Sequence, residues 1–245
     1  MLKSPTTGVS GSPLLSDRMV QRVTAALLVL YCGAQVVTIV TRIASGTDTE
    51  SSSESMAMIA ANHSWYMASK IANLVAAFLL LASGILIYRV FRPFDQTLAL
   101  LASAFFAVAA SLWLLSSLAG LAIAEVIGGS SGPTATYIAG SQSPAFNAIE
   151  PVRAIAGRVG FTAAALALAF LGILIALARP MPRWFGWAAL PTAVAMLFIW
   201  DPEASAMHRI GGAALLLWFL AVAAWLALKG VSPRDQGAVQ LENDC

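Results

Sequence analysis

Residues 71–124 read IANLVAAFLLLASGILIYRVFRPFDQTLALLASAFFAVAASLWLLSSLAGLAIA, and this stretch decides the fold. Two long apolar runs flank a short turn that holds Arg89, Arg92 and Asp95. A bilayer core about 30 Å thick is crossed by about 20 apolar residues in a helix, so each run is long enough to span a membrane. The short turn between them predicts an antiparallel pair of transmembrane helices.

The composition of the whole chain agrees with this hairpin. Of the 245 residues, 59% are hydrophobic and 11% are charged, which is too little charge for the surface of a soluble domain. This composition excludes a water-soluble enzyme, a nucleic-acid-binding domain and a disordered regulator. The net charge of +2 also gives no reason to expect nucleic acid as a partner. We therefore expect an integral membrane protein whose solvent is the lipid bilayer.

Six uncharged runs along the chain are of the length that a membrane span requires. They are Val23–Thr41, Ile71–Tyr88, Thr97–Ala124, Val159–Ala178, Trp184–Trp200 and Ile210–Leu228. The fifth run is short and carries Pro191 near its middle, so a five-helix protein is an alternative. We predict an all-α, polytopic bundle of six transmembrane helices over residues 20–230. A disordered tail at 1–19 and a polar tail at 231–245 are expected to flank it.

The basic residues indicate how this bundle is oriented. With the amino terminus inside, nine of the 14 basic residues lie on the cytoplasmic side. They are Lys3, Arg18, Arg22, Arg89, Arg92, Arg179, Arg183, Lys229 and Arg234. Because cytoplasmic segments carry an excess of Lys and Arg, we predict that both termini are cytoplasmic. The alanine-rich composition is typical of a bacterial source, so the expected location is the bacterial plasma membrane.

The remaining charges gather near the outer ends of the predicted helices, beneath long connections at 44–62 and 128–148. We expect a polar vestibule there that binds, and in one version of the hypothesis moves, a small amphiphile or lipid. The candidate ligand-binding residues are Arg42, Lys70, Glu125, Glu150, Arg153, Arg158, Asp201, Glu203 and Arg209. Arg158 is expected to lie deepest of the group that it forms with Glu150 and Arg153, because these two precede it on the same helix. The alternative is that these side chains extend to the interface and pair there, as the i, i+3 spacing of Glu150 and Arg153 allows.

Two further hypotheses belong to other functional classes. A membrane-embedded hydrolase or transferase would use His63, Ser64, Asp201 or His208, although such sets of polar residues arise by chance in loops. No histidine or cysteine has the spacing of metal ligands, so we expect no metal and no cofactor. A structural or assembly protein would use the small residues of the fourth and sixth spans, such as Gly160 and Ala164, which also make a homodimer possible. We favour a protein that is not an enzyme.

Motifs at the helix ends resemble those of a known family. They are Tyr88, Pro93 and Gln96 with Leu98-Ala99-Leu100, the turn MPRWFG at 181–186, and WLALKG at 225–230. Over Val20–Val231 the chain resembles the bacterial family of domain of unknown function 4386 (DUF4386). The resemblance implies six helices in a membrane and supplies neither substrate nor mechanism. Family members often carry Arg and Glu where this chain has FAVAA at 106–110, and His where it has residues 153–158, so an activity that needs those groups would be lacking here.

Overall fold

The computed structural model describes residues 17–47, 52–128, 144–201 and 203–231. Of the tails predicted at 1–19 and 231–245, residues 1–16 and 232–245 lie outside these ranges, whereas residues 17–19 belong to the first helix. The described part is all-α and contains no strand. Its elements are α1 (Asp17–Ser45), α2 (Ser52–Ala61), α3 (His63–Phe91), α4 (Gln96–Gly128), α6 (Pro144–Ala178), α7 (Arg183–Leu197), the 3-10 turn η1 (Phe198–Trp200) and α8 (Ser205–Leu228).

Five of these helices, namely α1, α3, α4, α6 and α8, are long and apolar enough to cross a membrane. The chain is therefore an integral membrane protein, as its composition predicts. The fifth predicted span is divided between α7, which has 15 residues, and η1, which has three. At about 1.5 Å per residue, α7 alone is about 22 Å long and falls short of the bilayer core.

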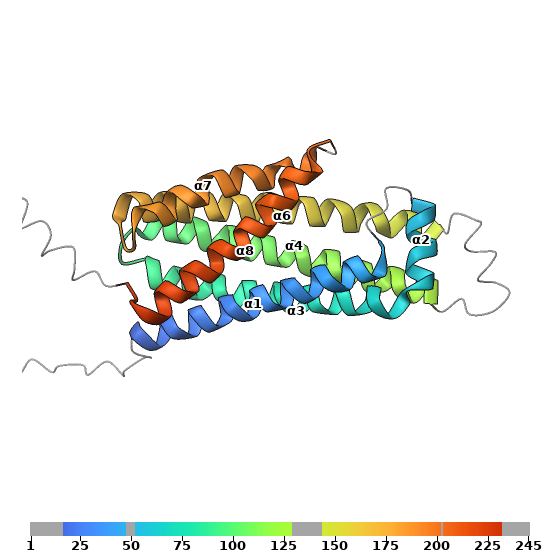
Figure 1. Ribbon diagram of the computed structural model, residues 1–245, viewed down its shortest axis with the longest axis horizontal. Helices are drawn as coiled ribbons and strands as arrows, with labels where there is room; N and C mark the ends of the chain where they lie inside the picture. The colour runs from blue at the N-terminus through green and yellow to red at the C-terminus, as the bar shows by residue number, and fades with distance from the viewer. Residues whose placement is uncertain (1–16, 48–51, 129–143, 202, 232–245) are drawn as a thin grey trace, which may run out of the picture.

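The long helices form a closed ring in which each contacts the next. Helix α1 contacts α3, α3 contacts α4, α4 contacts α6, α6 contacts α7, and α7 contacts α8. Helix α8 in turn contacts α1, which closes the ring. Figure 1 shows α8 crossing the other helices obliquely. Large buried side chains from several helices, including Phe91, Phe106 and Phe219, fill the interior. Much of the outer surface is apolar, as a lipid-facing surface requires.

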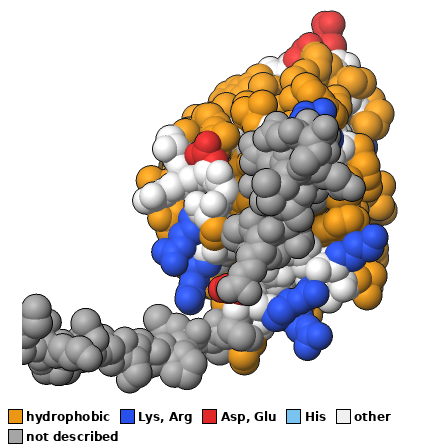
Figure 2. All heavy atoms as spheres, turned by 90° about the vertical axis from the view of Figure 1, so that its left-hand side faces the viewer, with side chains coloured by type: hydrophobic (Ala, Val, Ile, Leu, Met, Phe, Trp, Pro, Cys, Tyr) orange, Lys and Arg blue, Asp and Glu red, His pale blue; other side chains and the backbone are white. Residues whose placement is uncertain are grey.

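The first and last helices meet at one end of the bundle, which we call the inner end. The Gln21 amide donates to the Val231 carbonyl (2.7 Å) and accepts from the Val231 N–H (3.1 Å). All the described basic residues assigned to the cytoplasm lie at this end and are exposed: Arg18, Arg22, Arg89, Arg92, Arg179, Arg183 and Lys229. Figure 2, which looks onto this end, shows lysine and arginine side chains around an apolar body.

Small residues of α6 let neighbouring helices approach closely. A Cβ at Gly160 would lie 2.6 Å from the Trp113 ring of α4, and one at Gly186 of α7 would lie 2.5 Å from the carbonyl oxygen of Gly172. Gly160, which is also a candidate for a dimer face, and Gly172 thus pack inside the bundle.

The opposite, outer end is partly covered by α2, which lies across the long helices (Figure 1). Met56 and Ile59 of α2 pack in a small cluster with Tyr66, Ile123 and Phe146. The connection expected at 44–62 therefore contains a helix, because these apolar side chains give it a face to bury. Of the connection expected at 128–148, residues 129–143 lie outside the described part, and α6 already begins at Pro144.

Candidate functional site

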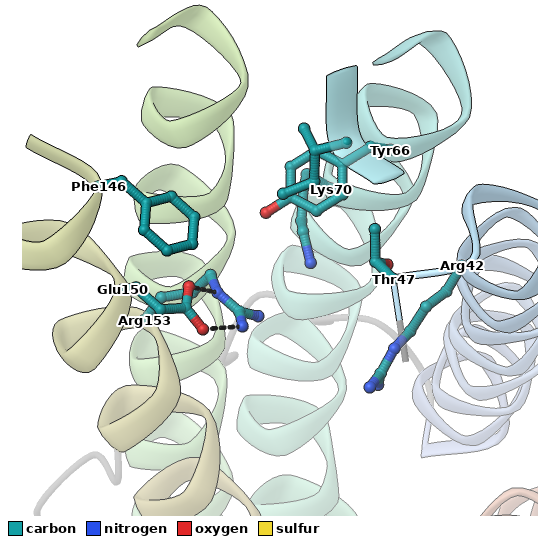
Figure 3. A pocket seen from close by; sticks show the side chains of 8 residues that line it. Arg42, Thr47, Tyr66, Lys70, Phe146, Glu150 and Arg153 are labelled. Atoms are coloured by element: carbon teal, nitrogen blue, oxygen red, sulfur yellow. Dashed lines mark hydrogen bonds and ion pairs between the residues drawn. The ribbon is translucent and has the colours of Figure 1, made fainter. Parts of the chain in front are cut away.

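A small cavity of about 40 Å³ lies at the outer end, and we call it the outer cavity. This is room for about three water molecules or for a few non-hydrogen atoms of a ligand. The residues that line it come from α1 and the segment after it, α2, α3 and α6 (Figure 3): Arg42, Thr47, Ile59, Tyr66, Lys70, Phe146, Glu150 and Arg153.

Helical spacing explains why these residues meet. Tyr66 and Lys70 are four residues apart on α3, and Glu150 and Arg153 are three apart on α6, so each pair shares a helix face. Arg42 lies in the last turn of α1, where the helix dipole favours a cation.

Lys70 is held in place by an aromatic ring and by a glycine. Its Nζ lies 4.7 Å from the centroid of the buried Tyr66 ring, which is a cation–π geometry. Its aliphatic stem packs on Gly120 of α4, where an added Cβ would lie 2.7 Å from the Lys70 Cδ. The ammonium is therefore positioned by two helices, α3 and α4.

Arg153 forms a bidentate ion pair with Glu150, as their i, i+3 spacing on one helix predicts. Its Nε donates to Glu150 Oε2 at 2.6 Å, and its Nη2 donates to Oε1. The Ser116 hydroxyl of α4 donates to the Arg153 carbonyl at 3.0 Å and ties this turn of α6 to its neighbour. The two bonds use two of the five guanidinium N–H donors.

The described residues that line the outer cavity carry more positive than negative charge. They contribute three cations and one carboxylate, and the hydroxyls of Thr47 and Tyr66 add polar contacts. At the edge of a low-dielectric region, such an excess favours an anionic group.

Four of the nine predicted ligand residues line the outer cavity, namely Arg42, Lys70, Glu150 and Arg153. The other five are exposed and do not line it: Glu125, Arg158, Asp201, Glu203 and Arg209. Arg158, expected to lie deepest of the three charged residues on this helix, is exposed and does not line the cavity. It follows Arg153 by five residues, a rotation of about 140° that turns it to another side of α6. The Asp201 carboxylate accepts a hydrogen bond from the Glu203 N–H at 3.0 Å, in the turn before α8.

The four residues of the hydrolase hypothesis have separate surroundings. His63 Nε2 lies 3.2 Å from the Ala124 carbonyl, and the His208 ring packs edge-on against Phe161 with centroids 4.6 Å apart. Ser64 and Asp201 are exposed. In the described part of the chain, none of the four hydrogen-bonds to another, so no nucleophile has a base beside it. Nor do the described ranges contain a group of three His, Cys, Asp or Glu side chains placed to hold a metal.

Sequence reasoning missed Thr47, Ile59, Tyr66 and Phe146 at the cavity, and it also missed a polar cluster below it. Asn73 of α3 donates to the Ser117 hydroxyl of α4 at 2.7 Å, and Gln35 of α1 donates to Asn73 at 3.4 Å. The available signal was the spacing of Tyr66, Lys70 and Asn73 along one face of α3.

Comparison with known protein families shows which family the chain belongs to. The family model described as "Domain of unknown function (DUF4386)" matches residues 23–230. No curated protein and no solved structure matches the chain.

Proposed function

Because the chain belongs to the DUF4386 family, whose description names no activity, we propose its function from the site alone: the outer cavity binds the anionic headgroup of a small amphiphile or lipid. The observation that carries this proposal is the meeting of three cations from three helices, Arg42, Lys70 and Arg153, around one cavity. Arginine and lysine donate charge-assisted hydrogen bonds to phosphate and carboxylate groups.

The depth of the cavity supports a membrane ligand. Arg42 follows Arg22 by 20 residues on α1, and Lys70 precedes Arg89 by 19 residues on α3. At about 1.5 Å per residue, each pair is about 30 Å apart, which is the thickness of a bilayer core. If the inner arginines lie at one interface, the cavity lies in the headgroup layer of the other.

The proposal includes six crossings, with α7 and η1 together as the fifth. Helix α6 ends at the inner end and α8 begins away from it, so residues 183–200 run from the inner end toward the outer end. Eighteen residues cover about 27 Å, close to the core thickness. Six crossings bring both termini to one side, and the basic inner end makes that side the cytoplasm, in our proposal that of a bacterial plasma membrane.

Native mass spectrometry tests the binding proposal. The purified protein is titrated with dioleoyl phosphatidic acid in detergent, and separately with inorganic phosphate. We expect phosphatidic acid to remain bound after the detergent is removed. Lys70→Met keeps the stem on Gly120 but removes the charge, so affinity should fall roughly tenfold or more. Arg158→Gln removes an exposed cation elsewhere and is the matched control.

Each contrary result removes a defined part of the proposal. Equal affinities for Lys70→Met and Arg158→Gln would take the binding site away from the outer cavity. Inorganic phosphate bound as tightly as phosphatidic acid would make the ligand a free anion and overturn the amphiphile.

A further inference from the structure

Below the outer cavity, three polar side chains from three helices form a cluster inside the apolar spans. We call Gln35, Asn73 and Ser117 the amide cluster. Gln35 Nε2 donates to Asn73 Oδ1 at 3.4 Å, and Asn73 Nδ2 donates to the Ser117 hydroxyl at 2.7 Å. Ser117 is buried, whereas Gln35 and Asn73 are only half-buried. Polar groups in a span either link helices or mark a ligand path.

The amide cluster lies on the same helix faces as the cavity residues. Gln35 precedes Arg42 by two turns of α1, and Asn73 follows Lys70 by one turn of α3. These separations place the amides about 5 to 10 Å deeper in the membrane than the cations. A ligand whose charged group occupies the outer cavity therefore extends past the two amides.

Near the depth of the amide cluster, the contacts of α8 change from α1 to α6 and α7. Below Gln35, α8 contacts α1 through the ring pair of Tyr31 and Phe219, with centroids 5.5 Å apart. Toward its outer end, α8 instead packs on α6 through His208 and on α7 through Gly211. A Cβ added at Gly212 would meet no atom within 4 Å.

We propose that the amide cluster binds the ester carbonyl groups of a diacyl glycerophospholipid whose phosphate occupies the outer cavity. This inference rests on the proposed function and names its ligand class. In such a lipid the ester groups lie directly beneath the phosphate, at the depth where the amides are. The Asn73 amide nitrogen carries two N–H donors and uses one of them on Ser117, so it retains a donor for a carbonyl acceptor. The acyl chains leave between α1 and α8, beside Gly212, where an added Cβ meets no atom within 4 Å.

The test compares two lipids that differ only in these acceptors. Dioleoyl phosphatidic acid and its ether-linked dialkyl analogue are titrated into the full-length protein, and both affinities are read by native mass spectrometry. We expect the wild type to prefer the ester lipid by about fivefold, the effect of one neutral hydrogen bond. Asn73→Leu, of similar size, should bring this ratio close to one. Lys70→Met should weaken both lipids alike and preserve the ratio.

Ser111→Ala is the matched control, because this α4 hydroxyl is exposed and bonds only to the Ala107 carbonyl of its own helix at 2.9 Å. It should leave the ratio unchanged. Gln35→Met carries the same test if Asn73→Leu does not fold. Equal binding of the two lipids by the wild type would overturn this inference and leave the proposed function standing. Binding of neither lipid would overturn both. A variant that melts earlier but keeps the wild-type ratio would make the amide cluster a helix linkage only.

Discussion

At the scale of single residues, close contacts between helices occur at glycines, which have no side chain to keep the neighbouring helix away. Gly120 leaves the space in which the stem of Lys70 lies, and Gly172 and Gly186 bring α6 and α7 together. The clearest comparison is on α8, where Gly211 and Gly212 are neighbours with opposite surroundings. A Cβ at Gly211 would lie 2.7 Å from the Met196 nitrogen, whereas one at Gly212 would have nothing within 4 Å.

Alanine at these two positions should therefore have opposite effects on stability. Gly211→Ala forces α8 away from α7 and should destabilise the protein by about 1 to 3 kcal/mol. Gly212→Ala meets no atom and should be neutral or slightly stabilising, since alanine is the better helix former. Thermal unfolding of the two variants in the same detergent measures the difference. Similar melting temperatures would contradict the close approach of α7 and α8.

At the scale of elements, helix length and span length are different quantities. Helix α6 begins at Pro144, well before the predicted span at Val159, and it continues through Glu150, Arg153 and Arg158. A search for uncharged runs finds the part of a helix that lies in lipid. Charged residues end such a run without ending the helix, because the projecting turns still form their backbone hydrogen bonds. The cavity residues of α6 belong to these projecting turns.

The short α7 gives the prediction that belongs to this scale. In a background with Cys32 and Cys245 replaced by serine, single cysteines are placed at Arg183 and Glu203, at the two ends of α7 and η1. If this segment crosses the bilayer, a membrane-impermeant thiol reagent should label the Glu203→Cys variant in intact cells. It should label the Arg183→Cys variant only after permeabilisation. Labelling of both from one side would mean that the chain has five crossings.

At the scale of the whole molecule, the two ends of the bundle differ in charge. The inner end carries exposed arginines and Lys229, whereas at the outer end Arg42, Lys70 and Arg153 line a cavity beside α2. Because positively charged segments are retained in the cytoplasm during insertion, we expect this asymmetry to orient the protein with its inner end in the cytoplasm.

Fusions to the carboxyl terminus test that orientation. We expect a green fluorescent protein fusion to fluoresce in a bacterial host and an alkaline phosphatase fusion to be inactive, since the phosphatase needs export to fold. Replacing Arg89, Arg92, Arg179 and Arg183 together by glutamine should weaken this preference. An active phosphatase fusion on the wild-type chain would place the carboxyl terminus outside.

Four properties of this protein could be predicted from its sequence. The all-α class, the membrane location, the family and the ion pair of Glu150 with Arg153 all follow from local properties: apolar run length, short motifs and i, i+3 spacing. Each segment inserts into the bilayer according to its own hydropathy and flanking charges. These features can therefore be predicted from the order of residues along the chain.

Which polar groups meet depends on how the helices pack against one another. This packing placed Arg153 at the outer cavity and turned Arg158 away, and it joined Gln35 and Asn73 inside runs that the sequence marks only as apolar. These outcomes depend on the rotation of each helix about its axis and on the oblique path of α8. The rotation of a helix and the angle at which it crosses its neighbours are set by packing between helices distant in sequence. The hydropathy of a single helix does not predict either quantity.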